Sequence, residues 1–136
     1  MNMRVRTSIP GFIAVLATVV QAQVRDIVVV MGPGAAALTK SQLANVYLGR
    51  NNNLTPIDLP ESNPIRQAFY KYATDRDPPQ IKTVWSRLTF TGHGQPPKEL
   101  ENAAAVKKAV AGDPKAVGYI DGADVDASVK VVLVLN

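Results

Sequence analysis

Residues 24–49, VRDIVVVMGPGAAALTKSQLANVYLG, contain the pattern that decides the fold. Its first eight residues, 24–31, end in a continuous apolar, β-branched run, which is typical of a buried strand. A Gly-Pro-Gly sequence then breaks the strand. Helix signals follow: Thr39 as the N-cap with Gln42 three residues later predicts a capping box, and Gly49 is a natural terminator. A buried strand joined to a capped helix predicts an α/β domain.

The alternation of strands and helices continues along the chain. Residues 54–59 predict a short strand, which Pro56 places towards a sheet edge. The expected order is β-α-β-α-α-α-β-β, in which the opening β-α-β unit is a right-handed parallel crossover. A small mixed sheet covered by helices is the simplest architecture for this order. The remaining elements are helices after Asn63, Asp77 and Asn102, an irregular segment at 91–97, and strands at 116–120 and 129–135.

Apolar residues at helical spacing predict which side chains of these helices are buried. The first helix is expected to bury a stripe that includes Tyr47, and a hydrophobic staple is expected around its cap. The third is expected to place Trp85 in the core. The full set is Leu43, Val46 and Tyr47, then Ile65, Ala68, Phe69 and Tyr72, then Ile81, Val84, Trp85 and Leu88.

The first 22 residues have the pattern of a targeting segment. Two arginines precede a mostly apolar run at 9–20, and small residues end at Ala22. This pattern predicts a signal peptide (1–22) that is cleaved after Ala22, which leaves an exported, periplasmic domain of residues 23–136. A transmembrane anchor is the alternative, but the run of about 12 residues contains Pro and Gly, whereas a spanning helix needs roughly 20 residues.

The composition excludes several function classes. Removal of the two signal arginines leaves 13 basic and 11 acidic residues, a net charge of +2, with no run of Lys and Arg. A nucleic-acid or membrane-surface footprint is therefore not supported. The chain has no cysteine, which excludes cysteine catalysis, thiolate metal ligands and disulfides.

No catalytic centre, metal site or cofactor motif is expected. Residues 34–41 match a phosphate loop except that Thr39 replaces the second glycine, and Thr39 is also needed as a helix cap. His93 is the only histidine, it lies between two glycines, and no serine occupies a nucleophile elbow. The nearest group of acidic residues lacks the glycine and distal glutamate of a calcium loop and indicates a solvated turn: Asp121, Asp124 and Asp126.

Residues 61–66, ESNPIR, are the local feature most able to bind a ligand. They place Ser62 and Asn63 at a helix N-terminus, with Arg66 one turn into the helix. Free N–H groups and the helix dipole can hold an anion at such a position. Ordinary capping is the alternative, with Arg66 on a solvated face and paired with Glu61.

Five elements in order resemble phosphate-type periplasmic binding proteins. The helix at 39–49 is similar to their L-x-x-I-F-x-G helix, and residues 54–69 are similar to their strand and S-G-T-x-x-x-F helix. Trp85, the turn at 90–92 and residues 116–120 match their later W…F-x-G…G-A-I-G-Y elements. The chain looks closest to the short, stand-alone members labelled phosphate transporter substrate-binding-like, which share the turn at residues 90–97.

The resemblance implies one lobe of a type II periplasmic-binding-protein-like fold. In full-length relatives two lobes close around phosphate, which hydroxyls, backbone N–H groups and an arginine hold. Ser62, Asn63 and Arg66 are the positions that carry over. This sequence departs from the family at Pro64, which removes a backbone N–H, and it contains no second lobe.

Two functions follow as expectations from the resemblance and its departures. The first is a non-enzymatic, exported binding module that binds phosphate or another oxyanion weakly, with an ABC transporter as the implied system. The second is an interaction module that kept the fold without the ligand, with an envelope protein or a second copy as its partner. Pro64 is the feature that favours the second.

Overall fold

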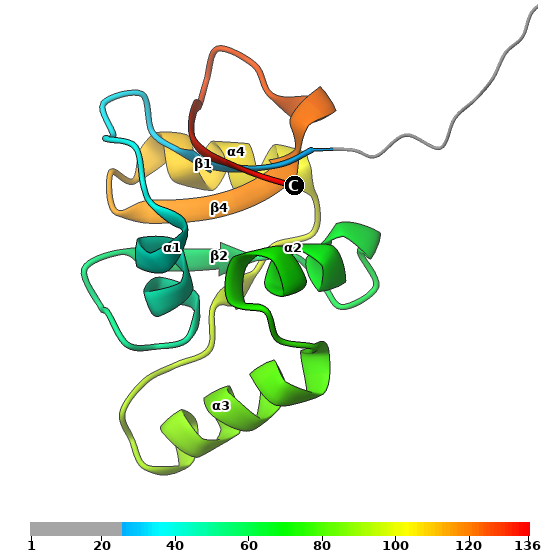
Figure 1. The fold of residues 1–136 in the computed structure, drawn as a ribbon. Coiled ribbons are helices and arrows are strands. Elements are labelled where there is room, and N and C mark those ends of the chain that lie inside the picture. Colours follow the sequence, from blue (N-terminus) through cyan, green and yellow to red (C-terminus); the bar gives the residue numbers. More distant parts are fainter. Residues whose placement is uncertain (1–25) are drawn as a thin grey trace, which may run out of the picture.

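Residues 26–136 are described by the structure, a computed structural model, and form a five-stranded mixed sheet with helices on both faces (Figure 1). The predicted signal peptide and its cleavage site lie outside the described residues. The strands are β1 (Ile27–Met31), β2 (Thr55–Asp58), β3 (Lys98–Glu99), β4 (Ala116–Asp121) and β5 (Lys130–Leu135). The helices are α1 (Lys40–Tyr47), α2 (Pro64–Thr74), α3 (Pro78–Phe90), α4 (Ala103–Gly112) and a short 3₁₀ turn, η1 (Gly122–Asp124).

The strand order is β3-β2-β4-β1-β5. Strand β2 is parallel to both β3 and β4, whereas β1 is antiparallel to β4 and β5. The predicted parallel crossover from β1 to β2 is therefore wrong, because β4 lies between these strands and β1 runs against it. Strand β3 was not predicted, and this two-residue strand occupies the edge position that Pro56 had suggested for β2.

The helix boundaries follow the predicted caps. In α1, the Thr39 side chain accepts the Gln42 N–H at 3.1 Å, and the Gln42 side chain accepts the Thr39 N–H at 2.8 Å, which confirms the capping box. Gly49 has φ +75° and donates its N–H to Val46. The Arg50 N–H bonds to the Asn45 carbonyl, which completes a Schellman ending. Asn63 and Asp77 are the N-caps of α2 and α3, each followed by Pro, as predicted.

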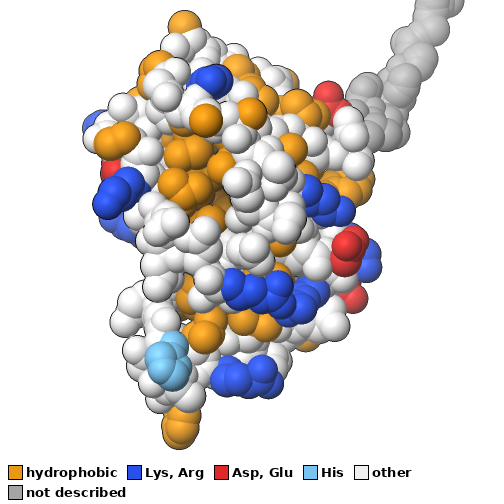
Figure 2. Space-filling model, turned by 60° about the vertical axis from the view of Figure 1, so that its left-hand side comes forward, with side chains coloured by type: hydrophobic (Ala, Val, Ile, Leu, Met, Phe, Trp, Pro, Cys, Tyr) orange, Lys and Arg blue, Asp and Glu red, His pale blue; other side chains and the backbone are white. Residues whose placement is uncertain are grey.

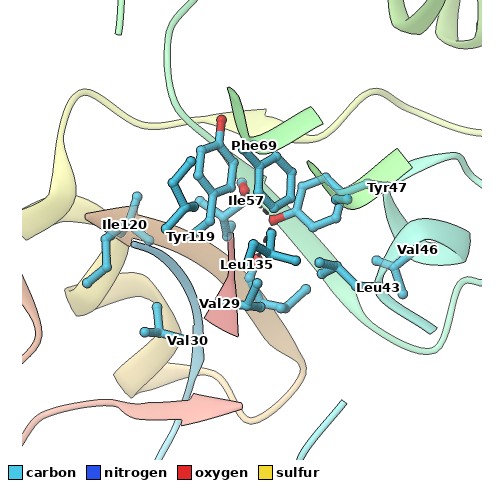
Figure 3. Packing of buried hydrophobic residues seen from close by; sticks show 14 of the residues in the cluster. Val29, Val30, Leu43, Val46, Tyr47, Ile57, Phe69, Tyr119, Ile120 and Leu135 are labelled. Atoms are coloured by element: carbon cyan, nitrogen blue, oxygen red, sulfur yellow. Dashed lines mark hydrogen bonds between the residues drawn. The ribbon is translucent and has the colours of Figure 1, made fainter. Parts of the chain in front are cut away.

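Aromatic rings fill the space between the sheet and helices α1 and α2 (Figure 3). The Tyr119 and Phe69 rings stack with centroids 3.7 Å apart, and Tyr47 meets Phe69 edge-on at 4.7 Å. The Tyr47 hydroxyl lies 2.6 Å from the Ile57 carbonyl and 3.1 Å from the Val117 carbonyl, which places it between β2 and β4. On the other face of β4, Gly118 lies under α4: an added Cβ would come within 2.5 Å of a Val106 methyl.

Helix α3 lies farthest from the sheet and contacts α2 (Figure 1). Trp85 attaches it to the end of α1, because its indole N–H donates to the Tyr47 carbonyl at 3.0 Å. The predicted core position of Trp85 is confirmed, with Ile81 also buried. In α2 the prediction was wrong at one position, since Tyr70 is buried and Tyr72 is 37% exposed. Tyr70 turns inward because its hydroxyl bonds to Asp58.

Candidate functional site

The three predicted ligand residues lie together at the start of α2, in three different environments. Ser62 is exposed. The Asn63 side chain accepts the Ile65 N–H at 3.1 Å, and the Asn63 carbonyl accepts the Arg66 N–H at 3.1 Å. Pro64 at the first helical position has no N–H. Asn63 therefore occupies two of the N–H groups in the first turn, which agrees with the alternative interpretation of ordinary helix capping.

The Arg66 guanidinium is the cationic centre of the region, and its side chain is only 20% exposed. Its Nη1 donates to the Leu59 carbonyl at 2.8 Å and to Glu99 Oε2 at 2.9 Å. Its Nη2 lies 3.7 Å from Asp58 Oδ2. The predicted pairing with Glu61 is replaced by pairing with Glu99 of β3, which is 33 residues away in sequence. A distant partner of this kind follows from the sheet topology and not from local spacing.

Asp58, at the end of β2, is the buried acid beside Arg66, with 2% of its surface exposed. Its carboxylate accepts hydrogen bonds from the Leu59 N–H at 2.9 Å, the Tyr70 hydroxyl at 2.6 Å and the Tyr119 hydroxyl. Burial raises the pKa of the Asp58 carboxyl, against the opposing effects of the two tyrosine hydrogen bonds and the Arg66 charge. Burial, and then the Asp58 charge, raise the pKa of Tyr70 and Tyr119, so both hydroxyls stay protonated as donors.

A cleft of about 820 Å³ opens beside this cluster. Asp58, Arg66 and Glu99 line it together with Glu61, and α3 supplies its opposite wall. The lining that α3 supplies combines apolar residues, Ile81 and Trp85 among them, with the polar Lys82, Ser86 and Thr89. Pairs of prolines at 78–79 and 96–97 add to the apolar surface. Most of the charged groups of the cleft therefore come from the ends of β2 and β3 and the start of α2, and most of its apolar surface comes from α3 and the prolines.

The other candidates from the sequence do not form sites. The His93 side chain is exposed, at the surface of the face shown in Figure 2, and its Nδ1 lies 2.9 Å from the Thr91 hydroxyl. Thr39 serves as the α1 cap, which is the role that argued against a phosphate loop. Among residues 26–136, no three His, Cys, Asp or Glu side chains are grouped so that they could hold a metal ion.

The predicted acidic turn needs one correction. Asp124 and Asp126 are exposed as expected, but Asp121 is buried, and its side chain accepts the Ala123 N–H at 2.9 Å. The reason is that Asp121 is the last residue of β4, a central strand, and also the N-cap of η1.

Asp58 and Glu99 were not predicted from the sequence as residues of the site. Asp58 did carry a signal, because it is an acid between Ile57 and Leu59 in a strand pattern, and a charged group buried in that way needs hydrogen-bonding partners. Glu99 carried no such signal, since a two-residue strand is too short to show an alternation of apolar and polar residues. The role of α3 as the cleft wall also depends on its position in space, which its sequence does not encode.

The sheet and its covering helices define the fold, and the solved structures that share it include two proteins of phosphate transport. One is an ABC-type phosphate transport receptor from Vibrio cholerae, with 20% identity and a TM-score of 0.60 over 79% of this chain and 45% of that one. Another is a protein described as a phosphate ABC transporter substrate-binding protein, with bound phosphate, from Clostridium perfringens. It has 18% identity and a TM-score of 0.63 over 79% of this chain and 44% of that one.

These comparisons confirm the predicted fold, one lobe of the binding-protein type. The chain spans less than half the length of the two solved structures. No protein-family model matches the sequence, and no curated protein does. Both structural neighbours are described as components of phosphate transport. Within residues 26–136, no helix has the length and apolar character needed to cross a membrane.

Proposed function

We propose that this chain is an exported, periplasmic binding module of the phosphate-receptor type, which binds an oxyanion weakly at the start of α2. Ser62, Asn63 and Arg66 are the proposed ligand residues. The observation that carries the proposal is the pairing of Arg66, a positioned and partly buried guanidinium, with the exposed carboxylate of Glu99. A carboxylate and a phosphate present similar oxygen acceptors to a guanidinium.

The Arg66 guanidinium is already positioned to bind such a ligand. Its bond to the Leu59 carbonyl fixes one side of the guanidinium, and the Tyr70 ring lies 5.8 Å from it. Glu99 is held less firmly, because its side chain is 52% exposed and β3 contains only two residues. An oxyanion that takes the place of Glu99 on Arg66 exchanges one anion for another, so the buried cation stays paired throughout.

The same geometry predicts low affinity. Pro64 and the occupied N–H groups of Ile65 and Arg66 leave few backbone donors for the ligand. The Asp58 carboxylate behind Arg66 repels an incoming anion when it is ionised. The site is also open on the cleft side, whereas tight small-molecule sites bury most of their ligand. We expect a dissociation constant on the order of 1 mM for phosphate.

Calorimetric titration of the chain from residue 23 onwards with phosphate, and with sulfate for comparison, tests the proposal. This segment contains every described element and the whole core. Glu99→Gln removes the internal competitor from an exposed position and is expected to tighten binding about 2- to 5-fold, which is the usual value of a surface ion pair. Arg66→Ala is expected to abolish binding. Lys71→Ala is the matched control, because it removes an exposed α2 cation, and it should change nothing.

Absence of heat from both the wild type and the Glu99→Gln variant would overturn the proposed oxyanion site. The interaction module without a ligand would then be the better function. Export is tested separately: mass spectrometry of the protein recovered from the periplasm should show an N-terminus at Gln23. A retained N-terminus, or recovery from the membrane fraction, would contradict the predicted cleavage after Ala22.

A further inference from the structure

Phe90, the last residue of α3, is 92% exposed, far more than any other large apolar side chain among the described residues. Val134 follows at 48% and Tyr72 at 37%. A single exposed apolar residue usually needs no explanation. Phe90 differs because it lies on the rim of the cleft, whose wall is formed by its own helix. Figure 2 shows a hydrophobic group projecting from the same end of the molecule as the histidine.

The cleft beside Phe90 has the character of a pocket for an aromatic side chain. Ile81 and Trp85 are buried residues of the wall, and prolines 78–79 and 96–97 extend the apolar surface. Its volume of about 820 Å³ far exceeds the needs of a small inorganic anion at Arg66. The proposed oxyanion site therefore uses one side of the cleft and leaves the apolar side unused.

We propose that two copies of this chain pair through this face, with Phe90 of each copy inserted into the cleft of the other. An interface with two-fold symmetry must be self-complementary, since one patch contacts its own copy. This face meets that condition because one helix, α3, provides both the projecting group and the wall of the recess. The exposed charges of the cleft also have both signs, with Lys82 on α3 and Glu61 before α2, so a second copy offers each an opposite charge.

The proposal does not rest on oxyanion binding, since Phe90 and the apolar lining of the cleft carry it. An aromatic side chain buries about 150–250 Å². Two phenylalanines therefore supply only part of the roughly 1,200–2,000 Å² of a stable interface, and the cleft walls and rims must supply the rest. A weak, reversible dimer with a dissociation constant in the micromolar range is expected.

Sedimentation velocity of the chain from residue 23 onwards, from about 1 µM to about 1 mM, is the test. Phe90→Ser should weaken the dimer about 100-fold or more, because two buried aromatic groups are lost from one symmetric complex. This variant does not endanger the fold, since Phe90 makes so little contact with it. Val134→Ser is the matched control: it removes the next most exposed apolar side chain, on β5, and should leave association unchanged.

A mixing experiment distinguishes insertion of Phe90 into the cleft from nonspecific association. Ser86→Tyr adds a bulky group to the exposed cleft wall and should block the recess while leaving Phe90 intact. Phe90→Ser leaves the recess open and removes the side chain that is inserted. At a concentration on the order of 10 µM, each variant alone should be largely monomeric. An equimolar mixture should form a heterodimer through one intact Phe90 and one intact cleft. A wild type that stays monomeric at all concentrations, an unchanged Phe90→Ser dimer, or growth into larger oligomers overturns the proposal.

Discussion

Replacement of Trp85 by alanine tests how α3 is attached to the rest of the molecule. Trp85 is 9% exposed, and its indole N–H bonds to the Tyr47 carbonyl. Its ring also lies near Gly49, since a Cβ added there would come within 3.2 Å of it. Truncation of a buried Trp to Ala usually costs 3–5 kcal/mol. We expect the lower end of this range, because the cleft lets water reach both the space that the indole leaves and the Tyr47 carbonyl. We therefore expect a loss of about 3 kcal/mol in the free energy of unfolding.

The assay is urea unfolding followed by circular dichroism, because Trp85 is the only tryptophan and its fluorescence is lost with it. A loss of about 3 kcal/mol should lower the urea midpoint by about 2 M for a domain of this size. Phe90→Ala is the matched control on the same helix: it removes an aromatic ring that is 92% exposed and should cost less than about 0.5 kcal/mol at low protein concentration. Equal midpoints for Trp85→Ala and the wild type would refute the attachment of α3 through Trp85.

Three further substitutions test the core and the buried acid. Tyr47→Phe should lower the free energy of unfolding by roughly 1–3 kcal/mol, because it leaves buried carbonyls of β2 and β4 without the tyrosine donor. Tyr72→Phe, at an exposed position, should leave stability unchanged in the same urea assay. Gly49→Ala should cost roughly 1–3 kcal/mol, since φ is +75° and the new Cβ would clash with a Leu88 methyl. Gly34→Ala, with open space around it, should cost little. Equal losses of stability would refute the close packing at Gly49. Because the pKa of Asp58 is raised in the folded state, the folded state binds a proton more readily than the unfolded state. The stability of the wild type relative to Asp58→Asn should therefore rise as the pH falls from 7 to about 4. A flat or opposite trend in the unfolding free energies would contradict the buried, ionisable acid.

The local features of the fold could be predicted from the sequence because short-range chemistry determines them. The capping box at Thr39, the Asn-Pro start of α2 at Asn63 and the left-handed Gly49 all depend on residues within one helical turn. Each was found at the expected residue. The buried strand at the N-terminal end of the fold was also predicted, since a continuous β-branched run is typical of a central strand.

The order of the strands and the partners of the charged side chains could not be predicted in this way. Strand β4 comes after α4 in sequence but pairs between β1 and β2, and no local pattern encodes such pairing. For the same reason Arg66 was assigned to Glu61, its near neighbour, and not to Glu99. Helical spacing alone predicts that Tyr72, and not Tyr70, is buried. Tyr70 is turned inward by Asp58, a partner on a different element.

The proposed oxyanion site is tested most directly by a phosphate titration followed through the backbone amide and arginine side-chain N–H signals in two-dimensional NMR. We predict saturable shifts confined to residues 62–66 and to Glu99, with the Arg66 side-chain signal moving as Glu99 is displaced. Lys71 and the other exposed basic residues of α2 and α3 should show only the small, linear changes of ionic strength. Shifts that never saturate, or that appear without any change at Arg66, would contradict the site and leave the fold as a lobe without its ligand.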